Sequence, residues 1–191
     1  MFRRRRLPHR VPDESAVFVT WRLAGTTPHI PALLTNDPHP GRVFLLQDRE
    51  LDRTPVGPRW LKDPRIASVV AEALLYGEAA RGLYHLLAWV IMPNHVHVVL
   101  EPNGKLPDIM RWLKTATAYR ANALIVKTGA AFWSREYDDR WIRSDKELSS
   151  VIEYVERNPV TAGSAACPED WPWSSAAGVR VGPAARPPAL P

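Results

Sequence analysis

The chain has 191 residues, of which 46% are hydrophobic, and this size and composition exclude a disordered chain and predict one globular domain with a core. A single cysteine, Cys167, excludes an internal disulfide and a cysteine-based zinc site. A net charge of +5 favours a polyanionic partner, although such modest basicity can also serve solubility alone. Since no apolar run approaches the length of a membrane span, we expect a soluble, cytoplasmic protein.

The N-terminal third begins with a basic arm over residues 1–10. β-Branched and aromatic residues predict a strand over 16–23. Prolines indicate loop structure over 26–40, within a Pro-rich segment that extends to residue 62. A short amphipathic helix is expected over 43–51.

The central part alternates helices and strands. Asp63-Pro64 predicts the start of a helix that continues at least to Leu74, with proline in its first turn. Two apolar stretches at 84–92 and 95–101 predict a β-hairpin. A second helix is expected over 107–127, where apolar residues keep helical spacing.

The C-terminal part adds one strand and one helix. The strand is expected over 139–143, and the capping box Ser144–Glu147 opens a third helix that we expect to end at Asn158-Pro159. The element order predicts an α+β domain over 1–177, with helices packed on a mainly antiparallel sheet. We expect the Pro- and Ala-rich tail, 178–191, to lack fixed structure.

The hairpin carries two histidines two residues apart, His95 and His97. Alternate side chains of a strand point to opposite faces, so both histidines share one face while Val96 and Val98 point into a core. Two neighbouring imidazoles form half of a divalent-metal site. A hydrogen-bonded structural role is the alternative. The apolar flanks favour a shared metal, because burying an imidazole without partners costs about 1–3 kcal/mol.

Tyr154 and Asn158 are four residues apart on the third predicted helix, which places them on one face. They flank its apolar stripe, so we expect Tyr154 at the edge of the helix–sheet interface. On this pattern alone, the favoured account is structural, with Tyr154 as a boundary tyrosine and Asn158 as a helix cap.

Four motifs occur in order along the chain, and they are Met92–His97, Trp141–Arg143, Glu153–Gly163 and Trp171–Ser175. Together they resemble the single-tyrosine HUH transposases, specifically the REP-associated tyrosine transposase branch, over roughly residues 8–177. The resemblance implies the HUH endonuclease fold, a ferredoxin-like antiparallel sheet with helices packed on it.

The resemblance also implies a site, with Tyr154 as the nucleophile and His95, His97 and Asn158 as ligands of Mg²⁺ or Mn²⁺. The implied activity is nicking and strand transfer of single-stranded DNA that forms REP-like hairpins, through a 5′-phosphotyrosine, by a monomer or homodimer. A cation with open positions polarises a phosphate, and tyrosine, with a pKa near 10, is a more usable nucleophile than a sugar hydroxyl.

The main rival nucleophile is Tyr119 on the second predicted helix, near Lys114 and Arg120. The position four residues later, which corresponds to the spacing of Tyr154 and Asn158, is Ala123 and offers no ligand, so we favour Tyr154.

DNA contacts are assigned only by residue type. The candidates for phosphate contact are Arg22, Lys114, Arg120, Arg140 and Arg143, each of which is equally explained as a solvated surface residue. Exposed aromatics among Trp21, Trp133 and Trp141 are candidates for base stacking.

Two other functions compete with the transposase interpretation. One is a domesticated DNA-binding protein that recognises palindromic repeats without turnover, and the other is a metal hydrolase of a small phosphate ester. Retention of His95, His97, Tyr154 and Asn158 argues against the binder, and a covalent protein–DNA adduct would exclude both.

Overall fold

The computed structural model describes residues 15–26, 51, 57–125 and 131–178. The expected basic arm, most of the segment 26–62 with its predicted helix, and the tail beyond Gly178 lie outside the described residues. Within the described ranges, no helix is long and apolar enough to span a membrane.

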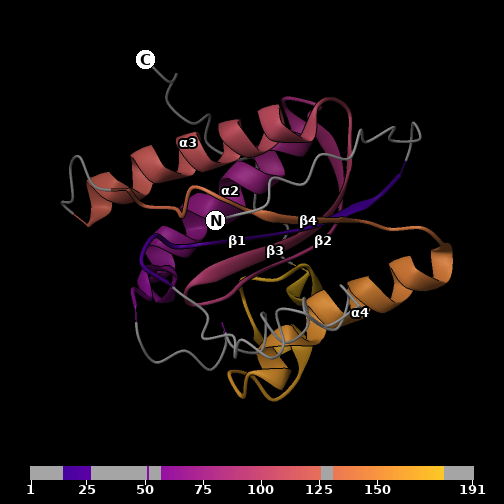
Figure 1. Ribbon diagram of the computed structural model, residues 1–191. Helices are drawn as coiled ribbons and strands as arrows, with labels where there is room; N and C mark the ends of the chain where they lie inside the picture. Colours follow the sequence, from indigo (N-terminus) through magenta and orange to yellow (C-terminus); the bar gives the residue numbers. More distant parts are fainter. Residues whose placement is uncertain (1–14, 27–50, 52–56, 126–130, 179–191) are drawn as a thin grey trace, which may run out of the picture.

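In this part of the chain, four antiparallel strands form one sheet in the order β2-β3-β1-β4 (Figure 1). The strands are β1 Val17–Arg22, β2 Tyr84–Ile91, β3 His95–Pro102 and β4 Asp138–Trp141. The helices are α2 Pro64–Ala79, α3 Leu106–Leu124 and α4 Asp145–Thr161, with short 3-10 turns η2 Trp60–Lys62, η3 Pro168–Asp170 and η4 Ser175–Ala177. The order β1-α2-β2-β3-α3-β4 with β1 and β3 central is the ferredoxin-like arrangement, so the predicted fold class is confirmed.

Helices cover both faces of the sheet, with α2 and α3 on one side and α4 on the other (Figure 1). Val19, Trp21 and Val98 belong to the apolar cluster beneath α2 and α3. Phe18 and Val99, their neighbours along the strands, belong to a second cluster beneath α4. The sheet is therefore the middle of three layers, and helices cover the side chains at the centre of each face.

Local signals account for the helix starts. The side chain of Asp63 accepts a hydrogen bond from the backbone N–H of Arg65 at 2.9 Å, which caps α2 before Pro64. Ser144 caps α4 by accepting from the backbone N–H of Glu147 at 3.2 Å, as the capping box predicts.

The expected end of the third helix was wrong, because α4 continues through Pro159 to Thr161. Proline removes only its own N–H donor, and two more residues complete the last turn. Gly163 lies just past the helix end, and its φ of +67° lets the chain turn so that Ser164 N–H reaches the Pro159 carbonyl at 2.8 Å. The second helix, α3, ends at Leu124, three residues before the expected Lys127.

The contact between α2 and β2 depends on Gly77. A Cβ at this position would overlap the hydroxyl of Tyr84 and lie 2.8 Å from its Cζ and 3.0 Å from Cζ3 of Trp112. Tyr84 is buried, and its hydroxyl donates to the Leu74 carbonyl at 2.8 Å. Moving the ring aside would therefore break this hydrogen bond and disturb the packing around it.

We therefore expect Gly77→Ala to destabilise the protein by about 1–3 kcal/mol, despite the better helix propensity of alanine. Urea denaturation measures this change. Gly104→Ala is the matched control, since a Cβ there meets nothing within 4 Å. Equal stability of both variants would contradict the packing argument.

Candidate functional site

Beneath α4, the two central strands place polar side chains side by side. In the register of β1 and β3, Thr20 pairs with His97. Arg22 pairs with His95. Directly opposed residues of antiparallel strands project to the same face, so all four share the face of Phe18, on the α4 side.

The two histidines are fully buried and face each other, with 3.0 Å between their Nε2 atoms. Their other ring nitrogens are held by neighbours. His95 Nδ1 lies 2.7 Å from Oδ1 of Asn94, and His97 Nδ1 lies 2.7 Å from Oγ1 of Thr20. The contacts at Nδ1 thus fix the orientation of both rings, and the two Nε2 atoms are directed to a common point.

Tyr154 reaches this face from α4. Its ring centroid lies 6.3 Å from that of His97 and 6.2 Å from that of Phe18. Tyr154 is half-buried, as expected for the edge of the helix–sheet interface, while Asn158 one turn later is buried on the same helix. The structure therefore brings His95, His97 and Tyr154 together and places Asn158 on the sheet-facing side of α4.

The histidine pair fits a divalent cation by its spacing. Two neighbouring ligands of an octahedral cation, each at about 2.1 Å, lie about 3.0 Å apart, which matches the separation of the two Nε2 atoms. The described residues contain no group of three or more His, Cys, Asp or Glu side chains suited to a metal. The further ligand that the sequence predicts, Asn158, would contribute an amide oxygen.

The rival tyrosines lie elsewhere. Tyr119 is 59% exposed on α3, which packs on the opposite face of the sheet from the histidines. Burial, followed by the charge of Glu78, raises the pKa of Tyr84, which is held in the core by its hydrogen bond to Leu74. Among these tyrosines, only Tyr154 lies beside the histidine pair.

The predicted DNA contacts separate into two groups. Arg22 is on the histidine face and partly exposed, with its Nε donating to the Thr26 carbonyl at 3.0 Å. Arg140 pairs with Phe18 across β1 and β4, which places it on the same face, where it forms an ion pair with Glu147. Arg143, just beyond β4, is exposed.

Lys114 and Arg120 lie on α3, in the layer on the far side of the sheet. The Lys114 ammonium donates to the Arg135 carbonyl at 2.8 Å, and burial lowers the pKa of this lysine. Arg120 forms a 2.6 Å ion pair with Glu72 of α2. Both cations therefore link neighbouring elements of the fold.

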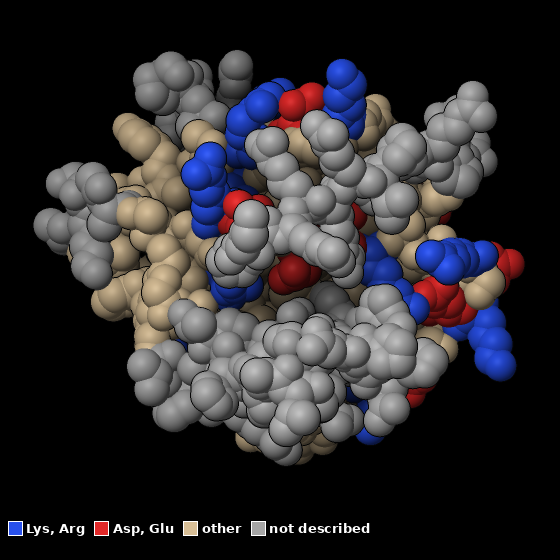
Figure 2. All heavy atoms as spheres, viewed as in Figure 1, with Lys and Arg blue, Asp and Glu red and all other residues tan. Residues whose placement is uncertain are grey.

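Figure 2 shows one face of the molecule, on which basic and acidic side chains are interspersed. The coloured residues of the face shown there form no single large basic patch.

Two of the three candidates for base stacking, Trp21 and Trp133, are not exposed, so these two assignments were wrong. Both are buried, with relative exposures of 2% and 6%, and their rings meet edge to face at 6.0 Å. The indole N–H of Trp133 donates to the Thr117 hydroxyl at 2.8 Å. Trp141 is half-buried.

Sequence reasoning missed Thr20 and Asn94. Thr20 is a lone hydroxyl in an otherwise apolar strand core, and Asn94 directly precedes the first histidine. These were usable signals, but only the register of β1 against β3 shows that Thr20 reaches His97.

After α4, the residues Trp171–Ser175 return to the free edge of β2. The N–H of Ile91 donates to the Trp173 carbonyl at 2.8 Å. The Ser175 hydroxyl donates to the Glu156 carboxylate on α4 at 3.0 Å. This edge segment therefore joins the sheet to the helix that carries Tyr154.

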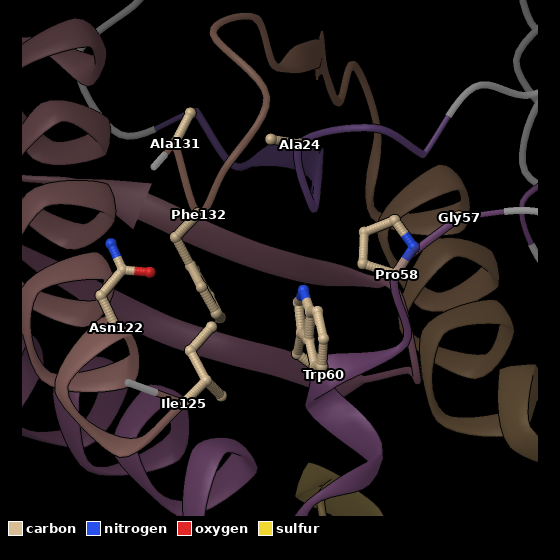
Figure 3. Close-up of a pocket in the computed structure, with 8 residues that line it drawn as sticks. All are labelled: Ala24, Gly57, Pro58, Trp60, Asn122, Ile125, Ala131 and Phe132. Carbon is tan, nitrogen blue, oxygen red and sulfur yellow. The ribbon is translucent and has the colours of Figure 1, made fainter. Parts of the chain in front are cut away.

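A separate cavity of about 440 Å³ lies on the other side of the sheet. Trp60 and Phe132 face it from two sides, and Phe132 packs in the cluster beneath α2 and α3 (Figure 3). The cavity is therefore distinct from the histidine site.

Known proteins resemble this chain over the same region. Residues 65–158 match the family described as IS200-like transposases. A protein of Haemophilus influenzae (strain ATCC 51907 / DSM 11121 / KW20 / Rd), assigned as a REP-associated tyrosine transposase, is 26% identical over 104 residues. That match covers 48% of this chain and only 58% of the relative's length.

Among solved structures, a REP-associated tyrosine transposase bound to a REP hairpin aligns with a TM-score of 0.59 and 18% identity. The alignment covers 92% of this chain and 82% of that one. At this identity the likeness establishes the shared fold.

Proposed function

Because this chain is a relative of the REP-associated tyrosine transposases and matches the IS200-like transposase family over residues 65–158, we propose that it nicks single-stranded DNA and transfers the strand. The covalent intermediate is a 5′-phosphotyrosine at Tyr154. One observation carries the proposal, namely the 3.0 Å pair of imidazole nitrogens with the Tyr154 ring 6.3 Å from His97.

The chemistry is a pair of phosphoryl transfers. The Tyr154 oxygen attacks the phosphorus in line, the bond from phosphorus to the 3′-oxygen breaks, and the phenolic proton leaves as the 3′-oxygen gains one. The new ester conserves the energy of the phosphodiester, so attack by another 3′-hydroxyl rejoins DNA without ATP. The half-buried position of Tyr154 suits this role, because its ring is held by Phe18 at 6.2 Å while the residue keeps access to solvent.

His95 and His97, with Asn158 as the third ligand, would hold Mg²⁺ or Mn²⁺. When bound, the cation polarises the phosphate and neutralises the charge that develops on its oxygens. The two imidazoles contribute rigidity, since both are fully buried on β3 and held through Nδ1.

The substrate is DNA that folds into a hairpin with single-stranded flanks. Arg22, on the histidine face, is the best placed cation for phosphate contact, and Arg140 is the second. The REP hairpin bound by the solved relative supports this substrate class.

The test is an adduct assay on the full chain. Labelled oligonucleotides with a hairpin and single-stranded flanks are incubated with the protein and Mn²⁺ or Mg²⁺, then analysed under denaturing conditions. A denaturant-resistant protein–DNA complex is expected. Hairpin binding without any adduct would favour a DNA-binding protein that lacks turnover.

A further inference from the structure

The hydrogen bonds of Asn94, beside the histidines, allow only one orientation of its side-chain amide. It is 4% exposed, and its Nδ2 donates to the Leu51 carbonyl at 2.9 Å. A backbone carbonyl only accepts, so the amide nitrogen must face Leu51 and the amide oxygen must face the opposite way. That oxygen lies 2.7 Å from His95 Nδ1.

The orientation of Asn94 determines the tautomer of His95. An amide oxygen only accepts hydrogen bonds, so the hydrogen of the neutral His95 ring lies on Nδ1. The lone pair of this ring is then on Nε2, the atom that faces His97 at 3.0 Å. His95 is therefore set in the form that a metal ligand requires.

His97 has a different kind of partner. A threonine hydroxyl both donates and accepts, so the Thr20 hydroxyl suits either tautomer of His97 at its 2.7 Å distance from Nδ1. With the His95 lone pair on Nε2, the 3.0 Å contact is a hydrogen bond when His97 carries its hydrogen on Nε2. When that hydrogen is on Nδ1 instead, both Nε2 lone pairs face the same point and Thr20 accepts.

We infer that Asn94 and Thr20 are positioning residues with unequal roles: Asn94 holds His95 in one tautomer, whereas Thr20 lets His97 change tautomer when a divalent cation binds. The inference deepens the proposed function and rests on it for the role of the cation. The fixed tautomer of His95 stands on the hydrogen bonds alone, and it is a property of the metal-free protein.

The test is long-range ¹H–¹⁵N NMR of the histidine rings in the metal-free full chain, at a pH where both rings are neutral. His95 is expected to carry its hydrogen on Nδ1 and His97 on Nε2. Titration with Zn²⁺, a diamagnetic cation that binds imidazole, should move the His97 hydrogen to Nδ1 and leave His95 unchanged. A metal-free His95 with its hydrogen on Nε2 would overturn the inference. So would a Zn²⁺ complex in which His97 keeps its tautomer, or no Zn²⁺ binding at the pair.

Variants separate positioning from mere stability. Asn94→Ala should give His95 a mixture of tautomers, and Thr20→Val should lower Zn²⁺ and Mn²⁺ affinity about 10- to 100-fold by calorimetry, with recovery in Thr20→Ser. The matched control is Thr117→Val, which removes a buried threonine hydroxyl from the opposite layer, where it accepts from Trp133. A similar loss of affinity in Thr117→Val, or none in Thr20→Val, would contradict the positioning role.

These outcomes are independent of DNA cleavage. The expected tautomers without any adduct would overturn the proposed function and leave the positioning of His95 intact. An adduct formed by a protein whose His95 carries its hydrogen on Nε2 would overturn the positioning of His95 and leave the proposed function intact.

Discussion

Tyr154→Phe will abolish the covalent protein–DNA adduct and leave the fold intact. In the proposed reaction the covalent bond to phosphorus forms at the Tyr154 hydroxyl, and phenylalanine lacks this group. The ring contacts with Phe18 and His97, at 6.2 and 6.3 Å, are retained, so the free energy of unfolding should change by less than about 1 kcal/mol. Denaturing electrophoresis of labelled DNA measures the adduct, and urea denaturation measures stability.

Tyr119→Phe is the matched control for this experiment. Tyr119 is the more exposed tyrosine, it lies on α3 across the sheet, and it also loses only a hydroxyl. Adduct formation should be unchanged. An adduct that survives in Tyr154→Phe and disappears in Tyr119→Phe would reverse the assignment of the nucleophile.

His95→Ala and His97→Ala should each reduce metal-dependent cleavage at least about 100-fold, because each removes a proposed ligand. The strand should persist, since Val96 and Val98 remain packed beneath α2 and α3. A cost of about 1–3 kcal/mol is expected, because Asn94 or Thr20 loses a buried partner. Cleavage is measured against Mn²⁺ concentration, and metal binding by calorimetry.

His85→Ala is the control for losing an imidazole. His85 is exposed on β2 and contacts Glu78 at 3.0 Å, remote from the pair. The His85→Ala variant should cleave DNA like the unsubstituted protein. Binding of single-stranded DNA should persist in this variant and in both variants of the histidine pair, and it should weaken as the salt concentration rises. Undiminished cleavage in a double variant of His95 and His97 would exclude their metal role.

Prediction from sequence succeeded where the signal is local. The hairpin, the capping box at Ser144 and the shared face of His95 and His97 follow from neighbouring residues, and the structure confirms each. The resemblance read from the sequence is supported as well, because residues 65–158 match the IS200-like transposase family and a REP-associated tyrosine transposase is 26% identical over 104 residues. The assigned roles of Tyr154 and Asn158 remain predictions.

Prediction failed where the outcome depends on partners distant in sequence or on competition between signals. The sequence Asn158-Pro159 predicts a helix stop, yet α4 continues to Thr161 and the chain turns at Gly163, where φ is positive. Burial of Trp21 and Trp133 depends on how β1 packs against the segment after α3, which no local pattern encodes. The contact of Thr20 with His97 joins residues 77 positions apart.

The edge segment Trp171–Ser175 has a consequence for where the folding unit ends. The family match stops at Asn158, whereas the hydrogen bonds from Ile91 and to Glu156 involve residues well beyond it. A protein shortened at the end of the match would leave the outer edge of β2 with unsatisfied backbone groups, a template for pairing with other chains. Aggregation of such a fragment would therefore reflect an uncovered strand edge and carry no information about the stability of the rest of the domain.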